Sequence, residues 1–583
     1  MNTRCLRNIS AFPVILLWSV IFFIIAFTFA CGCSPLANGE EAATLPSQEL
    51  STVSRDTRDS LIPSGSSVAP DSTVAPGSSI APDAPGLSGS SVSPASPDST
   101  VAPVTLSIFI NHPWYAVDSF SGIIPEEITK LTGVALDVEI AVDSQQLGLK
   151  IASSDLPDLV YTSAMIDRLS NDSLCYCYDD LIAQYGVEWE IDPILRANAI
   201  AYSADGKLYT ILNHYTSTED WADTNVAPMT GSMLVRKDIL DALGNPPITS
   251  FDELMGVYGM VKQNYPDMIP MTFSSSHRFN VMLCWIGLGT VPFIEQPDGS
   301  YLYYIRDERY KELMRILNRM YQYGYIVAEN FAAETSQQAF FLKSPYSSGG
   351  SFSNSACTQD ANIGAQASLT RINPSYLTVE MEPLAGSAFN DSNLGWSATF
   401  ITKANKDPGA SIEFIRWMFT PEAQKLTQWG REGMEYTLNA LGLPEYSEEV
   451  LDSIADDTYT HKYNPWFYLG GSAIYESEGR CALLPWDLYV KPYTAIKNSY
   501  RNLAWITAAL PINGSLEKEI YKRVSESVQG YESKVILSAT DMDFEDAFAE
   551  YMKSIELMDV ERLETYMTMY IPEYKLKYEA NKR

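Results

Sequence analysis

Histidine and cysteine are scarce in this 583-residue chain, and both are scattered along it. The four histidines form no spaced pair, and the eight cysteines contain no CxxC motif. A transition-metal site, a redox dithiol and a disulfide framework are therefore not expected. The hydrolase motifs GxSxG and HExxH are absent as well. The sequence predicts no catalytic residue, no metal and no cofactor.

Positive charge is also in short supply. Forty Lys and Arg residues stand against 72 Asp and Glu, which gives a formal net charge of −32. Proteins that bind nucleic acid are basic, so this balance argues against a nucleic-acid partner. An acidic surface keeps an exported protein soluble. Aromatic residues are frequent, at 12% of the chain, and aromatic rings are common platforms for sugar rings as well as large core residues.

The first 30 residues have the pattern of an export signal. An apolar, uncharged run at 11–30 follows Arg4 and Arg7 and ends at Cys31. This ending resembles a bacterial lipoprotein signal, in which a peptidase cuts before a cysteine that then receives a palmitate-containing lipid. Cys31 is the preferred lipidation site and Cys33 is the alternative. An uncleaved transmembrane anchor is a second interpretation, because the run is near the ~20 residues that span a bilayer.

Residues 31–103 have the composition of a disordered linker. The part from 64 to 103 contains no aromatic residue, no Lys and no Arg, and the heptapeptide PDSTVAP occurs at 70–76 and again at 97–103. Such a segment cannot bury enough apolar surface to offset the entropy lost on ordering. Its frequent prolines favour an extended chain. We expect a spacer that lifts a folded domain off the membrane.

The folded part is expected at 104–583. Strand patterns at 105–110, 134–142 and 155–161 alternate with helix patterns at 125–131 and 144–152. This order indicates an α/β fold with a largely parallel sheet. The roughly 480 residues after the linker are too many for one core, so two lobes are expected.

Several later helices have clear terminal signals. Thr249 or Ser250 begins a capping box with Glu253, and Thr420 precedes a proline at the first helical position. An apolar stripe from 310 to 321 ends at a glycine, and the segment 544–578 is expected to be helical.

Five segments, with gaps, together resemble the extracellular solute-binding lipoproteins of bacterial ABC importers, in particular the large carbohydrate-type family. They are LPDLV at 156–160, DGKLY at 205–209, which resembles a family hairpin, VRKDIL at 235–240 with a following Gly-x-Pro-Pro, and the segments 317–325 and 410–433. In that family the strand–helix–loop–helix order of the third segment marks the crossing into the second lobe, here near 235–245. The middle of the chain, 330–395, matches poorly.

The resemblance implies a two-lobed, periplasmic-binding-protein-like (type II) α/β fold with a hinge, an interlobe cleft and a helical C-terminal region. The chain would recross between the lobes later. It further implies a lipid-anchored receptor, a monomer on the outer face of the membrane of a Gram-positive-type bacterium. Such a receptor captures a saccharide, in the first instance an oligosaccharide, and delivers it to ABC permease subunits. Hinge closure gives a shape that a transporter can recognise, without any chemistry by the receptor.

In such folds the ligand contacts come from loops that follow strands. Aromatic rings beside amides, hydroxyls and carboxylates suit a carbohydrate, and the residues that meet this description are Trp114, Tyr115, Thr162, Ser163, Trp221, Asp223, Asn393, Trp396 and Trp466. Core packing is the alternative role for each tryptophan. The run 390–393 offers oxygen ligands for Ca²⁺, but it lacks the length and the final Glu of an EF-hand loop. A solvated loop is therefore expected there.

Two other classes of protein share these features. A surface-anchored glycoside hydrolase or lyase would need two carboxylates placed about 5 Å apart or further, and no motif singles out such a pair. A surface sugar-binding or sensor protein without a transport role would have the same fold. The sequence does not separate it from a transport receptor, because the difference lies in what the closed form contacts.

Overall fold

The structure is a computed structural model, and it describes residues 102–581 apart from 114, 116, 223, 225, 227, 229–231, 274–277, 333–349, 356–364, 367–368, 456–457, 466–468 and 485. The predicted signal and nearly all of the predicted linker lie outside the described residues, as do Trp114, Asp223 and Trp466. Within the described part, no helix has both the length and the apolar character needed to cross a bilayer.

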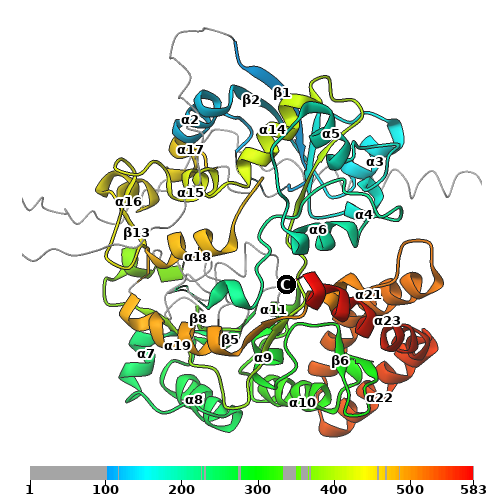
Figure 1. Ribbon diagram of the computed structural model, residues 1–583. Helices are drawn as coiled ribbons and strands as arrows, with labels where there is room; N and C mark the ends of the chain where they lie inside the picture. Colours follow the sequence, from blue (N-terminus) through cyan, green and yellow to red (C-terminus); the bar gives the residue numbers. More distant parts are fainter. Residues whose placement is uncertain are drawn as a thin grey trace, which may run out of the picture. The chain divides into compact units, whose positions relative to one another are not determined.

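The first lobe is built on a four-stranded sheet with the order β11-β3-β1-β2. Figure 1 labels two of these strands, β1 and β2, in blue. Two strands lie parallel to the central one and the edge strand is antiparallel; the four are β1 (Val104–Ile110), β2 (Val134–Ile140), β3 (Leu159–Thr162) and β11 (Ala398–Ile401). The crossovers are α2 (Ile123–Thr132) and α3 (Gln146–Ser153). The predicted strand–helix–strand–helix–strand order is confirmed.

Further helices complete the first lobe around this sheet. They are α4 (Ile166–Leu169), α5 (Tyr178–Tyr185), α6 (Pro193–Ile200), α14 (Pro408–Met418), α15 (Pro421–Trp429), α16 (Glu448–Ala455), α17 (Tyr459–Tyr463) and α20 (Ala504–Ala508). Their apolar side chains join those of the sheet in one buried core, the first core.

The second lobe has its own four-stranded sheet, with the order β5-β8-β4-β9. The strands are β4 (Leu234–Arg236), β5 (Ile269–Thr272), β8 (Ser351–Asn354) and β9 (Thr378–Glu380). The predicted strand–helix–loop–helix order is present as β4, α7 (Lys237–Ala242) and α8 (Phe251–Asn264). The second core already includes Trp221 and Val226, which precede the segment 235–245.

Other elements of the second lobe lie around that sheet and core. They are η1 (Glu219–Trp221), α9 (Asn280–Trp285), β6 (Phe293–Glu295), β7 (Tyr301–Tyr303), η2 (Tyr304–Arg306), α10 (Glu308–Gln322) and α11 (Glu329–Ala332). A hairpin of β12 (Tyr436–Leu438) and β13 (Pro444–Tyr446), with α18 (Ala473–Cys481) and α19 (Trp486–Ser499), comes later in the chain.

The helix boundaries follow the local signals. Ser250 Oγ accepts a hydrogen bond from the Glu253 N–H, and the Glu253 carboxylate accepts one from the Thr249 N–H. Thr420 Oγ1 caps α15 in the same way. Gly324, the predicted glycine, follows the last turn of α10 (Glu308–Gln322) at φ +68°, a conformation that glycine adopts without strain. These capping predictions are confirmed because each depends on neighbouring residues only.

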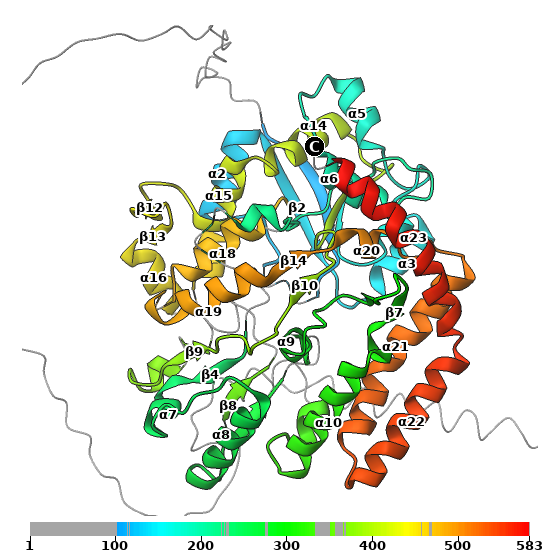
Figure 2. The same ribbon diagram turned by 60° about the horizontal axis from the view of Figure 1, so that its bottom comes forward.

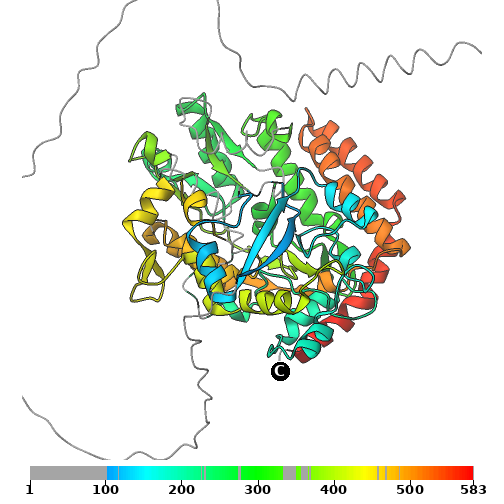
Figure 3. The ribbon, with the colours of Figure 1, turned by 90° about the horizontal axis from the view of Figure 1, so that it is seen from above.

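The C-terminal region is helical, as expected, and forms three helices. They are α21 (Leu516–Ile536), α22 (Asp541–Leu557) and α23 (Val560–Asn581). They run along one flank of the two lobes, next to α10 (Figures 2 and 3). The last helix also contacts the first lobe, where Tyr578 Oη donates to Asn198 Oδ1 on α6 at 2.6 Å. These helices therefore contact both lobes.

Three segments are hydrogen-bonded to one another where the two cores meet. β10 (Phe389–Asp391) pairs in parallel with β14 (Tyr500–Asn502). The buried Asn502 amide donates to the carbonyl oxygens of Thr216 and Asn393, at 2.8 and 3.2 Å. One side chain thus ties together the three segments that pass between the lobes.

The segment 205–209 does not form the expected hairpin. Asp205 Oδ1 accepts hydrogen bonds from Ser203 Oγ and the Lys207 N–H, and Oδ2 accepts one from Tyr209 Oη at 2.7 Å. The Asp205 carboxylate therefore closes a turn, and residues 205–209 are not assigned to a strand.

Candidate functional site

A cavity of about 590 Å³ lies where the two cores meet. Tyr202 and Leu394 line it from the first lobe, and Phe279 and Tyr303 line it from the second. This volume is within the range of small-molecule sites in proteins. A cavity with walls from two lobes changes shape when the lobes move relative to each other.

The lining is rich in neutral polar groups and aromatic rings. The hydroxyl and amide side chains are Asn280, Thr290, Ser392, Asn393, Thr507, Ser525 and Gln529, and the aromatic ones are Tyr202, Phe279, Tyr303, Tyr304 and Tyr521. Hydroxyls and amides both donate and accept hydrogen bonds, and rings offer apolar faces. This combination is suited to a ligand that carries many hydroxyl groups on an apolar ring.

Gly395 forms part of the cavity wall in a conformation that only glycine adopts readily. Its φ is +123°, and a Cβ atom there would lie 2.4 Å from Leu212 Cβ and 2.9 Å from the Asn213 carbonyl oxygen. The backbone of 394–396 therefore lies directly against the segment that leaves the first lobe. Ser392, on the same wall, accepts a hydrogen bond from Thr507 Oγ1 at 2.8 Å.

Trp396, the residue directly after Gly395, belongs to an aromatic cluster with His112, Tyr161 and His214. The Trp396 ring stacks on His112 with centroids 5.2 Å apart, and it meets His214 edge-on at 5.6 Å and Tyr161 at 6.3 Å. Burial lowers the pKa of His112 to about 4, so this imidazole is neutral at neutral pH. Trp396 is the half-buried ring that caps the buried rings of His112 and Tyr161.

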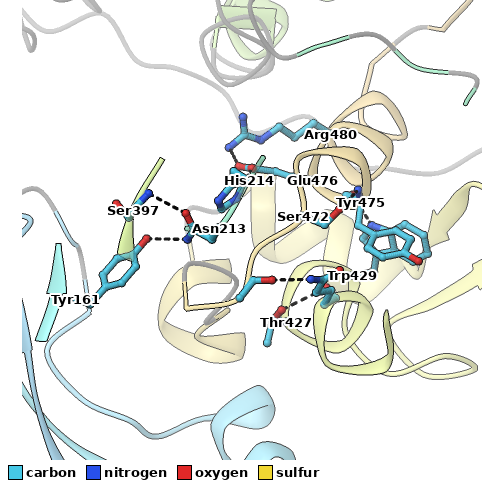
Figure 4. A network of polar contacts seen from close by, with 12 residues as sticks. Tyr161, Asn213, His214, Ser397, Thr427, Trp429, Ser472, Tyr475, Glu476 and Arg480 are labelled. Atoms are coloured by element: carbon cyan, nitrogen blue, oxygen red, sulfur yellow. Dashed lines mark hydrogen bonds and ion pairs between the residues drawn. The ribbon is translucent and has the colours of Figure 1, made fainter. Parts of the chain in front are cut away.

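Asn213 holds this cluster in place. Its Nδ2 donates to Tyr161 Oη at 3.1 Å, and its Oδ1 accepts from the Ser397 N–H at 2.9 Å (Figure 4). The amide therefore links β3 to the start of β11 and orients both aromatic neighbours.

A buried ionic group connects the aromatic cluster to α18. His214 Nε2 lies 2.9 Å from the Glu476 carboxylate, which also contacts the Arg480 guanidinium (Figure 4). Burial opposes the charged form of Glu476, but Arg480 and His214 outweigh that effect and hold the pKa of this carboxyl below its usual value. The Trp429 indole N–H donates to the Tyr475 carbonyl at 2.7 Å, which fastens α18 to α15.

The predicted binding residues are distributed unevenly around the cavity. Asn393 lines it, and Trp396 belongs to the aromatic cluster. Thr162 is buried at the end of β3, where its Oγ1 accepts from Asn111 Nδ2 at 3.0 Å, and Ser163 beside it is exposed. Tyr115 is buried in the first core.

Trp221 has a different environment from the other predicted residues. It is 2% exposed, its indole N–H donates to Thr216 Oγ1, and its ring packs against Tyr500. The structure therefore places Trp221 in the packing of the second core, which is the alternative role for a tryptophan.

The segment 390–393 is a loop only in its second half. Asn390 and Asp391 belong to β10, and burial raises the pKa of the Asp391 carboxyl. The loop expectation was wrong for these two residues because pairing with β14 depends on residues more than one hundred positions away. Residues 392 and 393 lie outside any strand, and Asn393 is exposed. In the part of the chain that the structure describes, no three His, Cys, Asp or Glu side chains form a group that could hold a metal.

Two charged residues of the cavity were missed by the sequence analysis. Arg278 lies 3.7 Å from Glu532, whose other oxygen accepts a hydrogen bond from Tyr310 Oη at 2.9 Å. Burial raises the pKa of Glu532 to about 7. One signal was present, because Glu532 shares the buried face of α21 with Val528 and Val535. A carboxylate within an apolar helical stripe is unusual.

Replacing Glu532 by glutamine is expected to flatten part of the pH dependence of stability. Because the folded-state pKa is raised, the folded chain keeps a proton that the unfolded chain releases between pH 4.5 and about 7. The contribution of this proton to the free energy of unfolding is complete below pH ~4.3 and is lost as the pH rises through 7. In urea unfolding between pH 4.5 and 8, the parent should lose on the order of 3 kcal/mol relative to E532Q.

The exposed carboxylate Glu550 on α22 supplies the control for this experiment. The free energy of unfolding of E550Q should change with pH in parallel with that of the parent across the same range. A parent curve that also runs parallel to E532Q would contradict the assignment of the titrating proton to Glu532.

Comparison with solved structures identifies the fold. No family model and no curated protein matches the sequence. The chain has the two-lobed α/β fold of ABC-transporter solute-binding proteins, as the sequence predicted.

The alignments with individual structures of this fold extend over almost the whole length of those structures. The alginate-binding protein AlgQ2 aligns with a TM-score of 0.57 and 18% identity, over 81% of this chain and 99% of its own. An HMO-binding solute-binding protein from Bifidobacterium longum infantis aligns with a TM-score of 0.59 and 12% identity, over 81% of this chain and 99% of its own. FusA from S. pneumoniae, in complex with kestose, aligns with a TM-score of 0.58 and 17% identity, over 81% of this chain and 100% of its own. At these identities the similarity establishes the fold.

Proposed function

We propose that this protein is an extracellular receptor that captures a saccharide between its two lobes and delivers it to an ABC permease. The observation that carries the proposal is the cavity of about 590 Å³, which both lobes line with hydroxyls, amides and aromatic rings. It lies beside the three hydrogen-bonded segments that pass between the lobes. Closure about these segments would bury the hydroxyls of a sugar against neutral hydrogen-bonding groups.

The structural neighbours support the same ligand class. They include an alginate-binding protein, an HMO-binding protein and a protein in complex with kestose. All three ligands are carbohydrates, which agrees with the composition of the cavity lining in this chain. An oligosaccharide is the ligand that we favour.

The second candidate is a surface glycoside hydrolase, because the described residues that line the cavity include two carboxyl groups, Asp391 and Glu532. In this structure Glu532 is engaged by Tyr310 and Arg278, and Asp391 accepts a hydrogen bond from the Ser392 N–H. Both carboxyls thus have structural partners, so we favour binding without hydrolysis.

The full-length chain, solubilised in detergent, would be screened on a glycan array and then by calorimetry with each glycan that binds. We expect saturable binding and an intact ligand, checked by mass spectrometry after overnight incubation. Release of cleaved sugar would support the hydrolase instead, and binding of peptides but not glycans would contradict the saccharide proposal.

Replacing Trp396 by alanine is expected to weaken saccharide binding about tenfold or more, because the aromatic surface next to the cavity wall is lost. Calorimetry with the best glycan of the array measures the change. The matched control is Trp189→Ala, since Trp189 is a half-buried first-lobe tryptophan that packs against Tyr178 and Phe419. Equal loss of affinity in both variants would indicate a general effect on folding and count against a contact by Trp396.

We also propose that the receptor is a monomer anchored through lipid on Cys31, on the outer face of the cell membrane. Cys33 is the alternative attachment site. In a bacterial host, lipid labelling should be lost in Cys31→Ala and kept in Cys33→Ala, and external protease should remove the folded part from intact cells. Labelling that is lost only in C33A would move the anchor to Cys33.

A further inference from the structure

Arg278 is the single cationic side chain among the described residues that line the cavity. It lies just before α9, and its side chain is 12% exposed. The guanidinium carbon lies 5.7 Å from the centre of the Phe331 ring. Arginine stays protonated in proteins, so the cavity holds a positive charge that is shielded from bulk solvent.

Among the described residues, the hydrogen bonds of Arg278 use one of its three guanidinium nitrogens. Nη1 donates to the Gln529 carbonyl oxygen at 3.1 Å and to Ser533 Oγ at 3.3 Å. Nε is buried and has no hydrogen-bond partner among the described residues. A buried donor on a charged group that lacks a partner is unfavourable by itself. The guanidinium therefore has hydrogen-bonding capacity left for a further acceptor.

The acidic side chain nearest to Arg278 is only a partial counter-charge. Glu532 lies 3.7 Å away, beyond hydrogen-bond distance, and it already accepts a hydrogen bond from Tyr310. Burial raises the pKa of Glu532 to about 7, so near neutral pH this carboxyl is protonated part of the time. Asp391, the other acid of the lining, also has a pKa raised by burial. A ligand anion that stays ionised at neutral pH would complete the charge balance.

We infer that the cavity selects saccharides that carry a carboxylate, and that the Arg278 guanidinium binds this carboxylate. A guanidinium and a carboxylate form charge-assisted hydrogen bonds that are stronger than those between neutral groups. The neutral hydroxyl and amide lining then serves the remainder of the sugar. This inference rests on the proposed function of saccharide capture and narrows its substrate class.

A structural role for Arg278 makes a different prediction. If the side chain only tethers the start of α9 to α21, its removal would distort the cavity and would lower the affinity for neutral and acidic sugars alike. If it binds the carboxylate, its removal would affect acidic sugars selectively. The preference between an acid and its neutral counterpart is therefore the quantity to measure.

The experiment uses the full-length chain and two matched ligand pairs, trigalacturonate with its methyl ester and sialyllactose with its methyl ester. The members of each pair differ in whether the carboxyl groups are ionised or esterified, and the two pairs cover uronic and sialic acids as sources of the carboxylate. Calorimetry at pH 7.5 should give roughly 10- to 100-fold tighter binding for the acid of at least one pair. Arg278→Gln should remove that preference, so that the acid and its neutral partner bind with affinities within about threefold of each other.

Two further variants sharpen the result. Arg523→Gln removes the same charge from an exposed position on α21 and should keep the preference for the acid. Glu532→Gln removes the competing negative charge and should strengthen acid binding at pH 8. The groups that face Glu532 are Arg278, Tyr303, Tyr304, Tyr310 and Tyr551, and the pKa of each of these tyrosines is raised by burial. Acid binding by the parent should therefore strengthen as the pH falls from 8 to 6.

The outcomes separate this inference from the proposed function. Neutral sugars that bind as tightly as their acids, or a preference that survives in R278Q, would overturn the carboxylate inference and leave saccharide capture standing. Absence of binding to every neutral and acidic glycan of both the pairs and the array would overturn saccharide capture, and the inference with it.

Discussion

Replacing Gly395 by alanine is expected to lower the free energy of unfolding by about 3 kcal/mol or more and to abolish saccharide binding. The glycine has φ +123°, and an added Cβ would lie 2.4 Å from Leu212 Cβ and 2.9 Å from the Asn213 carbonyl oxygen. Backbone strain and overlap each destabilise by about 1–3 kcal/mol. The two add here, because neither backbone segment can retreat without disturbing the first lobe.

The loss of binding follows from what this segment carries. Asn393 and Leu394 line the cavity just before Gly395, and Trp396 of the aromatic cluster comes directly after it. Any shift that relieves the overlap moves the wall and the cluster together. Urea unfolding measures the stability change and calorimetry measures the affinity.

A matched glycine distinguishes overlap from simple backbone preference. Gly299 also has positive φ, at +84°, but a Cβ there meets no atom within 4 Å. Gly299→Ala should be destabilising by only about 1 kcal/mol and should bind normally. Similar losses in the two variants would show that the close approach of Gly395 to Leu212 is not the cause.

Removing the Glu476 carboxylate is expected to lower both the stability of the fold and the affinity for the saccharide. Glu476→Ala leaves the Arg480 guanidinium, whose side chain is 15% exposed, without this counter-charge, and it removes the carboxylate that lies 2.9 Å from Nε2 of the buried His214 side chain. Breaking a buried ion pair from one side typically lowers stability by about 3–5 kcal/mol. The change also releases the link from α18 to the aromatic cluster, so the affinity for the saccharide should fall as well.

The pH dependence of this effect has a defined sign. The pKa of Glu476 is held below its usual value, so its contribution to stability is present above pH ~4.3 and is lost as the pH falls through the folded-state pKa. The difference between the parent and E476A in urea unfolding should therefore shrink on acidification.

An exposed pair of the same spacing provides the control. Lys577 and Glu573 lie 2.8 Å apart with side chains more than half exposed. Glu573→Ala should change stability by less than about 1 kcal/mol, because solvent screens such pairs. If E476A costs no more than E573A, the ionic group of His214, Glu476 and Arg480 does not stabilise the fold.

The site was only partly predictable. Of the residues predicted because they follow strands, Asn393 lines the cavity and Trp396 lies next to the cavity-lining Gly395. Trp221 fitted the same sequence pattern but packs in the second core. The local sequence does not determine whether a tryptophan side chain is exposed. Arg278 and Glu532 escaped notice because more than two hundred residues separate them in the chain.

The sequence by itself determined those features whose causes are local. Capping side chains at Ser250 and Thr420, a glycine after α10 and the alternation of apolar residues depend on neighbours within a few positions, and the structure confirms them. The fold class followed from the order of these elements and from the family resemblance.

Only the tertiary structure decided which distant segments meet. The antiparallel edge strand β11, the pairing of β10 with β14, and the contact between His214 and Glu476 each join parts of the chain that carry no signal of one another. Their partners are chosen by packing and burial over the whole fold, because a buried charge or strand edge is stable only beside a complementary one. The charge of the cavity is a property of that assembly.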